Sequence, residues 1–458
     1  MRYSKFINDT LKGRTGINWS YYRTYIAAKD VISPAESREF IRQYFEAGAK
    51  GLPLVLDPVE ANKFFCCSCH WGRKCDLFQI PAFENHDVTL PDDRATHTVS
   101  GFFLGLLIEN CLTGNTPLGL RDPLLLPFSY LWFLTFLYHD YGYCITEREH
   151  ALLQAPARAP IPISNDLWRS KAGLRFEYAK LKQVKRRLGI NASLFSPSWN
   201  PSCRYCRRRN CCAVRKNVHC LGMLIKEPWT MFKNSGLRFN TGTEIRRHRY
   251  TSTDTIRYFN YCINVWGKID HGITGGFLFY DRMVKNYISA YFSAIKESPD
   301  LSRDEAASFR NFTYMDKHFC IEQLPVFLHI AGCIAAHNIW KQSEDQREAY
   351  ERYLLDVLLA ENYKNITFEE DPLLYILALT DTLEPTKIYN QQKEYQKLTA
   401  REVANSIDVD YTPGTRKIRF SASSNIRIDP LYKKAKGLEG WTSAKCSMIG
   451  ANAFEIFI

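Results

Sequence analysis

One apolar run organises the chain: Leu124–Tyr138 (LLLPFSYLWFLTFLY) leads directly into two polar residues, His139 and Asp140. A helix that crosses a bilayer needs about 20 apolar residues, so this shorter run predicts a buried helix. Pro127 disrupts its first part, and Gly142 marks its end. Burying an imidazole beside a carboxylate is costly unless both are paired. A divalent metal is a partner that suits both groups.

Four further helical patterns each carry a residue type that binds metals. The first begins at Thr96, the second at Asp270, the third spans Gln323–Trp340 and the fourth begins at Asp371. They carry, in chain order, His97, His271, His337 and Asp381. Glycines in the first turns of the second helix indicate that another helix or a ligand approaches its backbone closely. His329, two turns before His337, is expected to be a core residue.

The C-terminal part of the chain combines one predicted amphipathic helix with a predicted β-hairpin. Ser343–Tyr363 has helical spacing, with an inward face formed by Tyr350, Tyr353, Leu354, Val357 and Leu358. Ile407–Phe420 alternates around a Thr-Pro-Gly-Thr turn, which is a hairpin signal, and Ala453–Ile458 predicts a last strand. We therefore expect a mostly α fold with a small C-terminal α/β element.

These patterns divide the chain into four predicted regions. They are an N-terminal helical and loop region (1–95), a helical core (96–149 and 256–390), a basic Cys-rich insertion (150–255) and a C-terminal α/β appendage (391–458). The insertion contains one Cys-x-x-Cys pair within a cluster that offers Cys203, Cys206, Cys211 and Cys220 to a structural zinc. No second Cys-x-x-Cys completes the zinc pattern, so thiols without metal are the competing interpretation.

Composition and charge bound the function classes. A content of 45% hydrophobic and 14% aromatic residues in 458 positions excludes a globally disordered chain. The net charge of +12 favours anionic partners such as phosphates, nucleotides or nucleic acid. Nucleic acid could bind the arginines of the insertion, although a solvated basic face is the commoner role of such residues. The N-terminus has no apolar signal-peptide core and no segment has transmembrane character, so we expect a cytoplasmic protein with reduced thiols and no membrane association.

The metal-binding residue types follow one another as H…HD…H…H…D. Their local contexts are Tyr-His139-Asp140-Tyr-Gly, Asp-His271-Gly-Ile-Thr-Gly-Gly, Ala-Ala-His337-Asn and Leu-Thr-Asp381-Thr-Leu-Glu-Pro. This order resembles the HD superfamily of metal-dependent phosphohydrolases, which implies an HD-domain helical bundle over roughly 95–390. The resemblance implies that His97, His139, Asp140 and Asp381 hold one metal, and that Asp140 bridges to a second metal held by His271 and His337. Such mixed ligation suits Fe, Mn, Ni, Co or Zn.

The His-Gly motif followed by small residues is similar to the subgroup that includes HD-GYP phosphodiesterases and symmetrical diadenosine-tetraphosphate hydrolases. This chain lacks the lysine that follows the His-Asp pair of HD-GYP proteins, the GYP triplet and the paired His-His. Cyclic dinucleotides are therefore not the expected substrate. The resemblance implies instead that a metal-bridging hydroxide hydrolyses a phosphoester or phosphoanhydride, which we expect to belong to a nucleotide.

Catalysis would then fall to Asp140, His271 and His337, while Arg94, Lys268 and Lys387 flank the motifs as candidates for holding phosphate. Two alternatives remain. The chain could be a non-catalytic HD-fold sensor of a nucleotide or RNA, or a zinc-stabilised nucleic-acid-binding protein that works through its cysteines. The complete set of six ligands favours an enzyme over a sensor.

Overall fold

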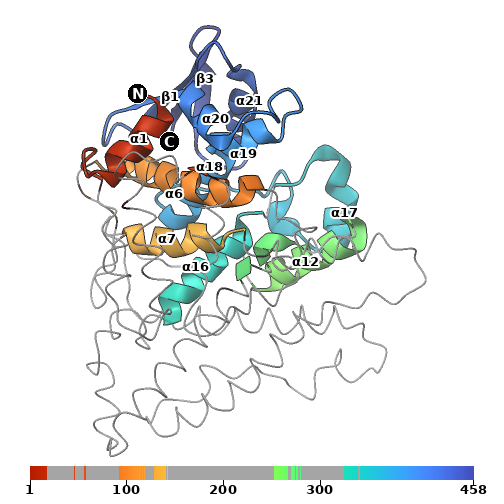
Figure 1. The fold of residues 1–458 in the computed structure, drawn as a ribbon. Coiled ribbons are helices and arrows are strands. Elements are labelled where there is room, and N and C mark those ends of the chain that lie inside the picture. Colours follow the sequence, from red (N-terminus) through yellow and green to blue (C-terminus); the bar gives the residue numbers. More distant parts are fainter. Residues whose placement is uncertain are drawn as a thin grey trace, which may run out of the picture. The chain divides into compact units, whose positions relative to one another are not determined.

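The structure is a computed structural model. It describes residues 1–17, 46, 56–57, 92–114, 116, 118, 128–140, 142, 252–266, 270–273, 275–276, 279, 324–338 and 341–458, with backbone only at a few helical positions such as 92–95. The chain divides into two compact units, whose elements are labelled in Figure 1. The first unit comprises Met1–Leu137, Arg238–Thr243 and Lys364–Ile458, and the second comprises Tyr138–Leu237 and Glu244–Tyr363.

The first unit is mainly helical. Its helices are α1 (Tyr3–Leu11), α6 (Asp92–Thr113), α7 (Phe128–Tyr138, whose last residue begins the second unit), α18 (Pro372–Leu383), α19 (Pro385–Asn390), α20 (Ala400–Ser406) and α21 (Asp429–Leu438). Nearly every side chain of α18 is buried, so this helix lies in the core. The carboxylate of Asp371 caps it by accepting a 3.1 Å hydrogen bond from the Leu374 N–H, which confirms the predicted start.

Two glycines of α6 allow α7 to pack closely against it. A Cβ atom at Gly101 would collide with the ring of Phe136, and one at Gly105 would collide with the indole of Trp132. The Trp132 indole N–H donates a 2.8 Å hydrogen bond to the Phe102 carbonyl of α6. Because a tryptophan N–H needs a partner when it is buried, this bond also fixes how the two helices face each other.

α7 begins at Phe128, directly after Pro127, in agreement with the predicted break in the first part of the apolar run. One predicted helix start differs from the structure. α6 begins at Asp92 and not at Thr96, so Thr96 is a fully buried residue inside the helix. The two aspartates at the start of α6 favour the earlier beginning because negative charge stabilises the first turn of a helix.

The C-terminal part of the first unit contains a four-stranded antiparallel sheet. Its strands are β1 (Ile407–Tyr411), β2 (Lys417–Ala422), β3 (Lys445–Met448) and β4 (Ala453–Phe457), in the order β1-β2-β4-β3. β1 and β2 form the predicted hairpin and β4 is the predicted last strand, so both predictions are confirmed. Phe420 and Phe454 stack between neighbouring strands and are fully buried. Helices with a small C-terminal sheet match the expected mostly α class.

The second unit is helical in its described residues. These form α12 (Ser252–Trp266), α16 (Leu324–Ala336), α17 (Arg347–Arg352) and the short 3₁₀ helices η6 (Glu344–Gln346) and η7 (Asp356–Leu358). α16 confirms the helix predicted within Gln323–Trp340. Among the described helices of both units, none is long and apolar enough to span a membrane.

The prediction of one continuous helix over Ser343–Tyr363 is wrong. The segment is broken into η6, α17 and η7, and Leu354 has a left-handed backbone with φ of 55°. Leu354 and Val357, which were expected to face inward, are 53% and 44% exposed. Tyr350 and Leu358 are buried as expected. The break turns the chain, so the second half no longer continues the helical face of the first.

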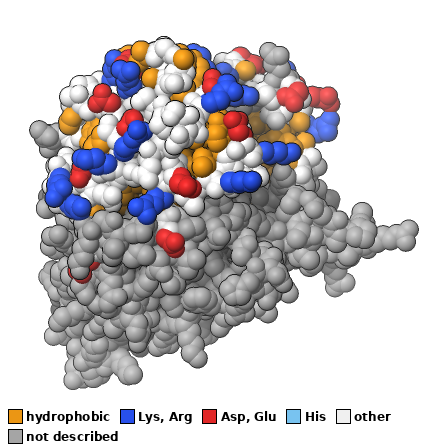
Figure 2. Space-filling model, turned by 45° about the horizontal axis from the view of Figure 1, so that its top comes forward, with side chains coloured by type: hydrophobic (Ala, Val, Ile, Leu, Met, Phe, Trp, Pro, Cys, Tyr) orange, Lys and Arg blue, Asp and Glu red, His pale blue; other side chains and the backbone are white. Residues whose placement is uncertain are grey.

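Charges of both signs mix on the surface. On the face drawn in Figure 2, lysine and arginine side chains of the described residues are interspersed with aspartate and glutamate side chains. Exposed ion pairs, such as Arg416 with Glu369 at 2.9 Å, combine the signs in the same way. The described part of this face therefore carries no basic patch of a single sign.

Candidate metal-binding site

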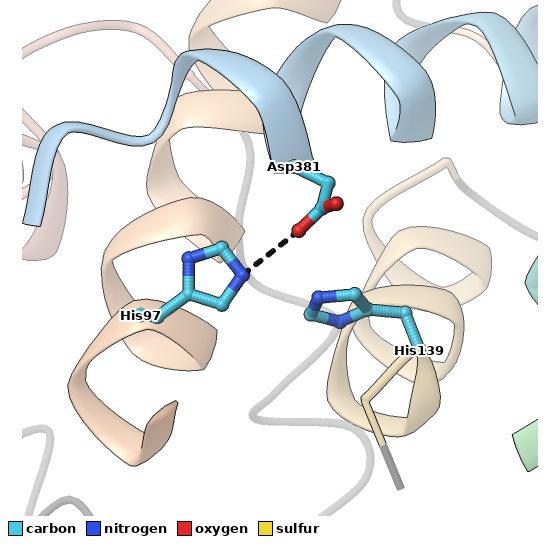
Figure 3. A group of neighbouring side chains, drawn as sticks. All are labelled: His97, His139 and Asp381. Carbon is cyan, nitrogen blue, oxygen red and sulfur yellow. Dashed lines mark hydrogen bonds and ion pairs between the residues drawn. The ribbon is translucent and has the colours of Figure 1, made fainter. Parts of the chain in front are cut away.

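The first unit brings together His97 and Asp381. His97 lies on α6 and Asp381 lies near the end of α18, and their Nε2 and Oδ1 atoms are 3.1 Å apart (Figure 3). The other ring nitrogen of His97, Nδ1, lies 2.9 Å from Oε2 of Glu384. The imidazole is 1% exposed, and its ring packs against Phe136 of α7 at 5.5 Å between centroids. Contacts on both ring nitrogens and on the ring face leave His97 a single orientation.

The charge of the His97 ring is set by opposing effects. Burial and the nearby Lys387 ammonium lower its pKa, but hydrogen bonds to Asp381 and Glu384 outweigh them and raise the pKa to about 8. A proton on Nε2 therefore satisfies the pair with Asp381 at neutral pH. A metal ion is the other cation that such a nitrogen and carboxylate bind.

Of the three residues predicted to hold phosphate, Lys387 is the one whose side chain lies in the described part of the structure. Its ammonium lies 2.5 Å from Oδ1 of Asp381, and its side chain is 26% exposed. The lysine thus places a positive charge beside the candidate metal ligand while keeping access to solvent. Lys268 lies outside the described residues, as does the side chain of Arg94.

The second unit brings together Asp140, His271 and His337. One ligand atom from each of these side chains lies within 4.8 Å of the other two. Oδ1 of Asp140 is 3.5 Å from Nε2 of His271, and the rings of His271 and His337 are 5.2 Å apart between centroids. The three residues are far apart in sequence, so only folding can produce this convergence.

His139 completes the ligand types of the second unit. It follows the last residue of α7 directly, and its Nε2 lies 3.5 Å from Oδ2 of the neighbouring Asp140. Its ring is fully buried and lies 5.6 Å from the ring of His337 between centroids. The second unit therefore gathers four of the six predicted ligands, and the first unit gathers the other two.

Glycines account for how closely the segments of the second unit approach one another. A Cβ atom at Gly142 would collide with the backbone carbonyl of His271. A Cβ atom at Gly272 would lie 2.9 Å from Nδ1 of His337, and one at Gly276 would collide with the Ala331 carbonyl of α16. These contacts confirm the expectation that glycines after His271 mark a close backbone approach.

Two residues lie near the predicted ligands of the second unit: Asn338, which the sequence analysis missed, and Asp270, which it placed at the start of the helix that carries His271. The side-chain amide of Asn338 lies 2.8 Å from Nε2 and 3.0 Å from Nδ1 of His271, and the Asn338 carbonyl accepts a 3.0 Å hydrogen bond from the Tyr258 hydroxyl. Asp270 accepts a 2.8 Å hydrogen bond from the Ile273 N–H. Each residue is adjacent in sequence to a predicted ligand, and that adjacency was the available signal.

The Asp270 carboxyl, next to His271 in the sequence, has a pKa well above its ordinary value. Burial raises its pKa to about 6, although hydrogen bonds from the Ile273 and Gly272 N–H groups and the proximity of His337 act in the opposite direction. Perturbed carboxyl groups of this kind gather at functional sites, and they also occur at buried helix caps. Here Asp270 is a cap whose position keeps a carboxyl near a ligand histidine.

The first unit also contains a residue that the sequence analysis did not single out, Glu384. It lies three residues after Asp381 in the sequence and contacts His97 through a fully buried carboxylate. Its only sequence signal is a glutamate directly before Pro385, which is typical of a helix cap. The link to His97 depends on tertiary structure.

The remaining candidate residues have different outcomes. The four insertion cysteines predicted as a structural zinc site, Cys203, Cys206, Cys211 and Cys220, lie outside the described residues. Cys111, Cys262 and Cys333 are buried thiols outside any disulfide. His329 is 2% exposed with its Nε2 at 3.6 Å from Cys333 Sγ, which confirms the expected core position.

Comparisons with protein-family models, curated proteins and solved structures return no significant match to this chain. The case for a function therefore depends on the side chains themselves. The described residues include groups of imidazoles and carboxylates that could hold a metal ion, among them Asp140, His271 and His337 of the second unit.

Proposed function

We propose that this chain is a metal-dependent phosphohydrolase of the HD type, with two divalent transition-metal ions among its six predicted ligands. The observation that carries the proposal is the convergence of Asp140, His271 and His337 within the second unit. The order of these residue types along the chain predicts the same set without spatial information. A chance selection of three residues separated by many positions would rarely converge in this way.

The distances in the second unit fit one metal ion. Two ligands about 2.1 Å from the same ion can be at most about 4.2 Å apart. The ligand atoms of Asp140, His271 and His337 lie within 4.8 Å of one another, so adjustments of less than about 1 Å bring all three to a common ion. Two imidazoles with one carboxylate are a ligand set that proteins use for iron and related ions.

The pair in the first unit fits a ligand role as well. The 3.1 Å separation of His97 Nε2 and Asp381 Oδ1 is in the range for two neighbouring ligands of one ion. The HD resemblance predicts that this pair shares one metal with His139 and Asp140, and that Asp140 also binds a second metal held by His271 and His337. That assignment stays a prediction.

The proposed chemistry is hydrolysis of a phosphoester or phosphoanhydride, with a nucleotide as the expected substrate. Bound metal ions would neutralise phosphoryl oxygens and make a hydroxide available at neutral pH. Lys387 would contribute a further positive charge for the substrate phosphate, because its side chain is partly exposed and its ammonium lies beside Asp381. The overall positive charge of the chain favours the encounter with an anionic substrate.

Metal content and turnover test the proposal together. The native protein, supplied with Mn²⁺ or Fe²⁺, is expected to retain about two metal ions and to hydrolyse a nucleotide, a dinucleoside polyphosphate or a generic phosphodiester. Asp140→Asn should lose bound metal and at least about 100-fold of the rate. Asp254→Asn is the matched control, because Asp254 is also buried in the second unit but lies outside the ligand set.

The alternatives give different results in the same experiment. Metal binding without turnover of any substrate in the panel would indicate a sensor. A protein that keeps zinc after Asp140→Asn and loses it when Cys203 and Cys206 are changed to serine would indicate the zinc-stabilised nucleic-acid binder. A native protein that retains no metal through dialysis would contradict the phosphohydrolase.

A further inference from the structure

Glu384 is a fully buried carboxylate between two helices of the first unit. It caps α19 by accepting hydrogen bonds from the N–H groups of Thr386 (3.0 Å) and Lys387 (2.9 Å) and from the Thr386 hydroxyl (2.8 Å). A helix cap on the surface would need no more than these bonds. Glu384 makes two additional contacts that reach α6.

Both additional contacts connect Glu384 with the beginning of α6. Ser100 donates a 2.5 Å hydrogen bond to Oε1, and His97 Nδ1 lies 2.9 Å from Oε2. Ser100 is itself tied to α1, because its carbonyl accepts a 2.6 Å hydrogen bond from the Tyr3 hydroxyl. The carboxylate is thus held from several elements and cannot rotate without breaking several bonds.

Every group in contact with the Glu384 carboxylate can donate a hydrogen bond. Two of these groups, the backbone N–H groups of Thr386 and Lys387, can only donate, and each of them bonds to a different oxygen. An ionised carboxylate can only accept hydrogen bonds. The 2.9 Å contact therefore requires His97 to donate its Nδ1–H to Glu384.

A proton on Nδ1 determines what the other ring nitrogen can do. In the neutral imidazole only one nitrogen carries a proton, so Nε2 has the free lone pair. That nitrogen points at Asp381 Oδ1, at 3.1 Å (Figure 3). The same ring orientation would present Nε2 as the ligand atom in the proposed metal centre.

We propose that Glu384 is the positioning residue of His97: it holds the ring in the Nδ1–H tautomer and directs Nε2 toward the metal shared with Asp381. This inference rests on the proposed metal centre for its functional meaning. Glu384 contacts neither substrate nor metal in this role. Carboxylates behind ligand histidines typically strengthen metal binding by 10–100-fold.

Glu384→Gln is a sharp test because of how the five hydrogen bonds divide between the two oxygens. Oε1 accepts from Ser100 and the Thr386 N–H, whereas Oε2 accepts from His97, the Thr386 hydroxyl and the Lys387 N–H. A carboxamide has one accepting oxygen. Either orientation of the glutamine carboxamide leaves one backbone N–H opposite its NH₂ group. The side chain of the variant should therefore adopt both orientations, and the two tautomers of His97 should both be populated.

The first readout is the tautomer of His97 in the protein without added metal. Nitrogen-15 NMR of the histidine rings, recorded as the pH is raised until the His97 ring is neutral, should show the Nδ1–H form in the native protein. Glu384→Gln should show a mixture. Ser100→Ala, which removes one bond to Oε1 and leaves Oε2 in place, should keep the Nδ1–H form.

The second readout is Mn²⁺ affinity, measured by calorimetry on the full chain. Glu384→Gln should weaken binding by about 10–100-fold. Glu109→Gln is the matched control, since Glu109 is a buried carboxylate of the same unit without contact to His97, and it should change neither affinity nor tautomer.

The outcomes separate this inference from the proposed function. A native protein whose neutral His97 ring carries its single proton on Nε2 overturns the positioning role, even if Glu384→Gln fails to fold. A variant that loses thermal stability but keeps the native tautomer and Mn²⁺ affinity shows that Glu384 is only a helix cap and also overturns it. If the native protein binds no Mn²⁺ yet shows the Nδ1–H form, the metal centre is contradicted while the orientation of His97 by Glu384 is supported.

Discussion

The buried carboxyl of Glu109 makes the stability of the first unit depend on pH in a predictable direction. Glu109 is 5% exposed, and its Oε1 accepts a 2.6 Å hydrogen bond from the Leu118 N–H. Burial raises its pKa from 4.5 to about 7, although hydrogen bonds from the Leu118 N–H and the Thr113 hydroxyl partly oppose the change. The carboxyl is therefore protonated in the folded protein under conditions in which the unfolded chain has lost that proton.

The sign and size follow from linkage between proton binding and folding. Because the folded pKa lies above the unfolded one, the contribution of Glu109 to stability is complete below about pH 4.5 and is lost as the pH rises through about 7. The difference between 4.5 and about 7 corresponds to about 3 kcal/mol, at roughly 1.4 kcal/mol per pH unit. Glutamine stays neutral at every pH and keeps an accepting oxygen for the Leu118 N–H.

Urea unfolding of the native protein and Glu109→Gln, followed by circular dichroism between about pH 4 and 8, measures this contribution. The two proteins should have similar free energies of unfolding at the acidic end. At the alkaline end the variant should be more stable by up to about 3 kcal/mol. Glu394→Gln, which changes an exposed glutamate of the same unit, is the matched control for the substitution itself. A constant difference between native protein and Glu109→Gln across this range would refute the assignment of the raised pKa to Glu109.

Three further substitutions test local features of the fold by their effect on unfolding. Gly276→Ala should destabilise the second unit by about 1–3 kcal/mol in thermal unfolding, because its Cβ would collide with the Ala331 carbonyl; unchanged stability would contradict the close approach. Leu354→Asn should stabilise by about 0.5–1 kcal/mol in urea, because asparagine tolerates the left-handed φ of 55° better than leucine, and a loss of stability would count against that strain. Thr399→Ala should cost about 1 kcal/mol, since it removes the cap that Thr399 and Glu402 form at α20, and a neutral result would show that solvent replaces the cap.

Local sequence rules were sufficient wherever a residue and its neighbours determine the backbone. Asp371 followed by Pro372 begins α18, since an aspartate can cap and a proline has the φ that a first helical position needs. The Thr-Pro-Gly-Thr segment turns β1 into β2 because glycine tolerates the positive φ of 75° found at Gly414. The histidines and aspartates of the candidate metal site could likewise be identified from the sequence, because they lie on or beside predicted helices.

Local rules failed where distant residues decide. A helix over Ser343–Tyr363 has suitable periodicity, but it would place residues 342 and 358 about 24 Å apart along its axis. In the structure the Gln342 N–H donates a 2.9 Å hydrogen bond to the Leu358 carbonyl, and the Ala360 N–H bonds to the Gln342 side chain at 3.0 Å. These contacts require the chain to turn back between the two segments, and the left-handed Leu354 lies within that turn.

The sequence by itself determined the mostly α class, the C-terminal hairpin and the identity of the candidate ligands, because these depend on periodicity, capping and chemical type. Tertiary structure alone decided which side chains form hydrogen bonds with the candidate ligands. Glu384 is 287 residues from His97, and no pattern of spacing or propensity connects them. A buried carboxylate needs several donors at once, and only the packed fold could bring those of α6 and α19 to the same place.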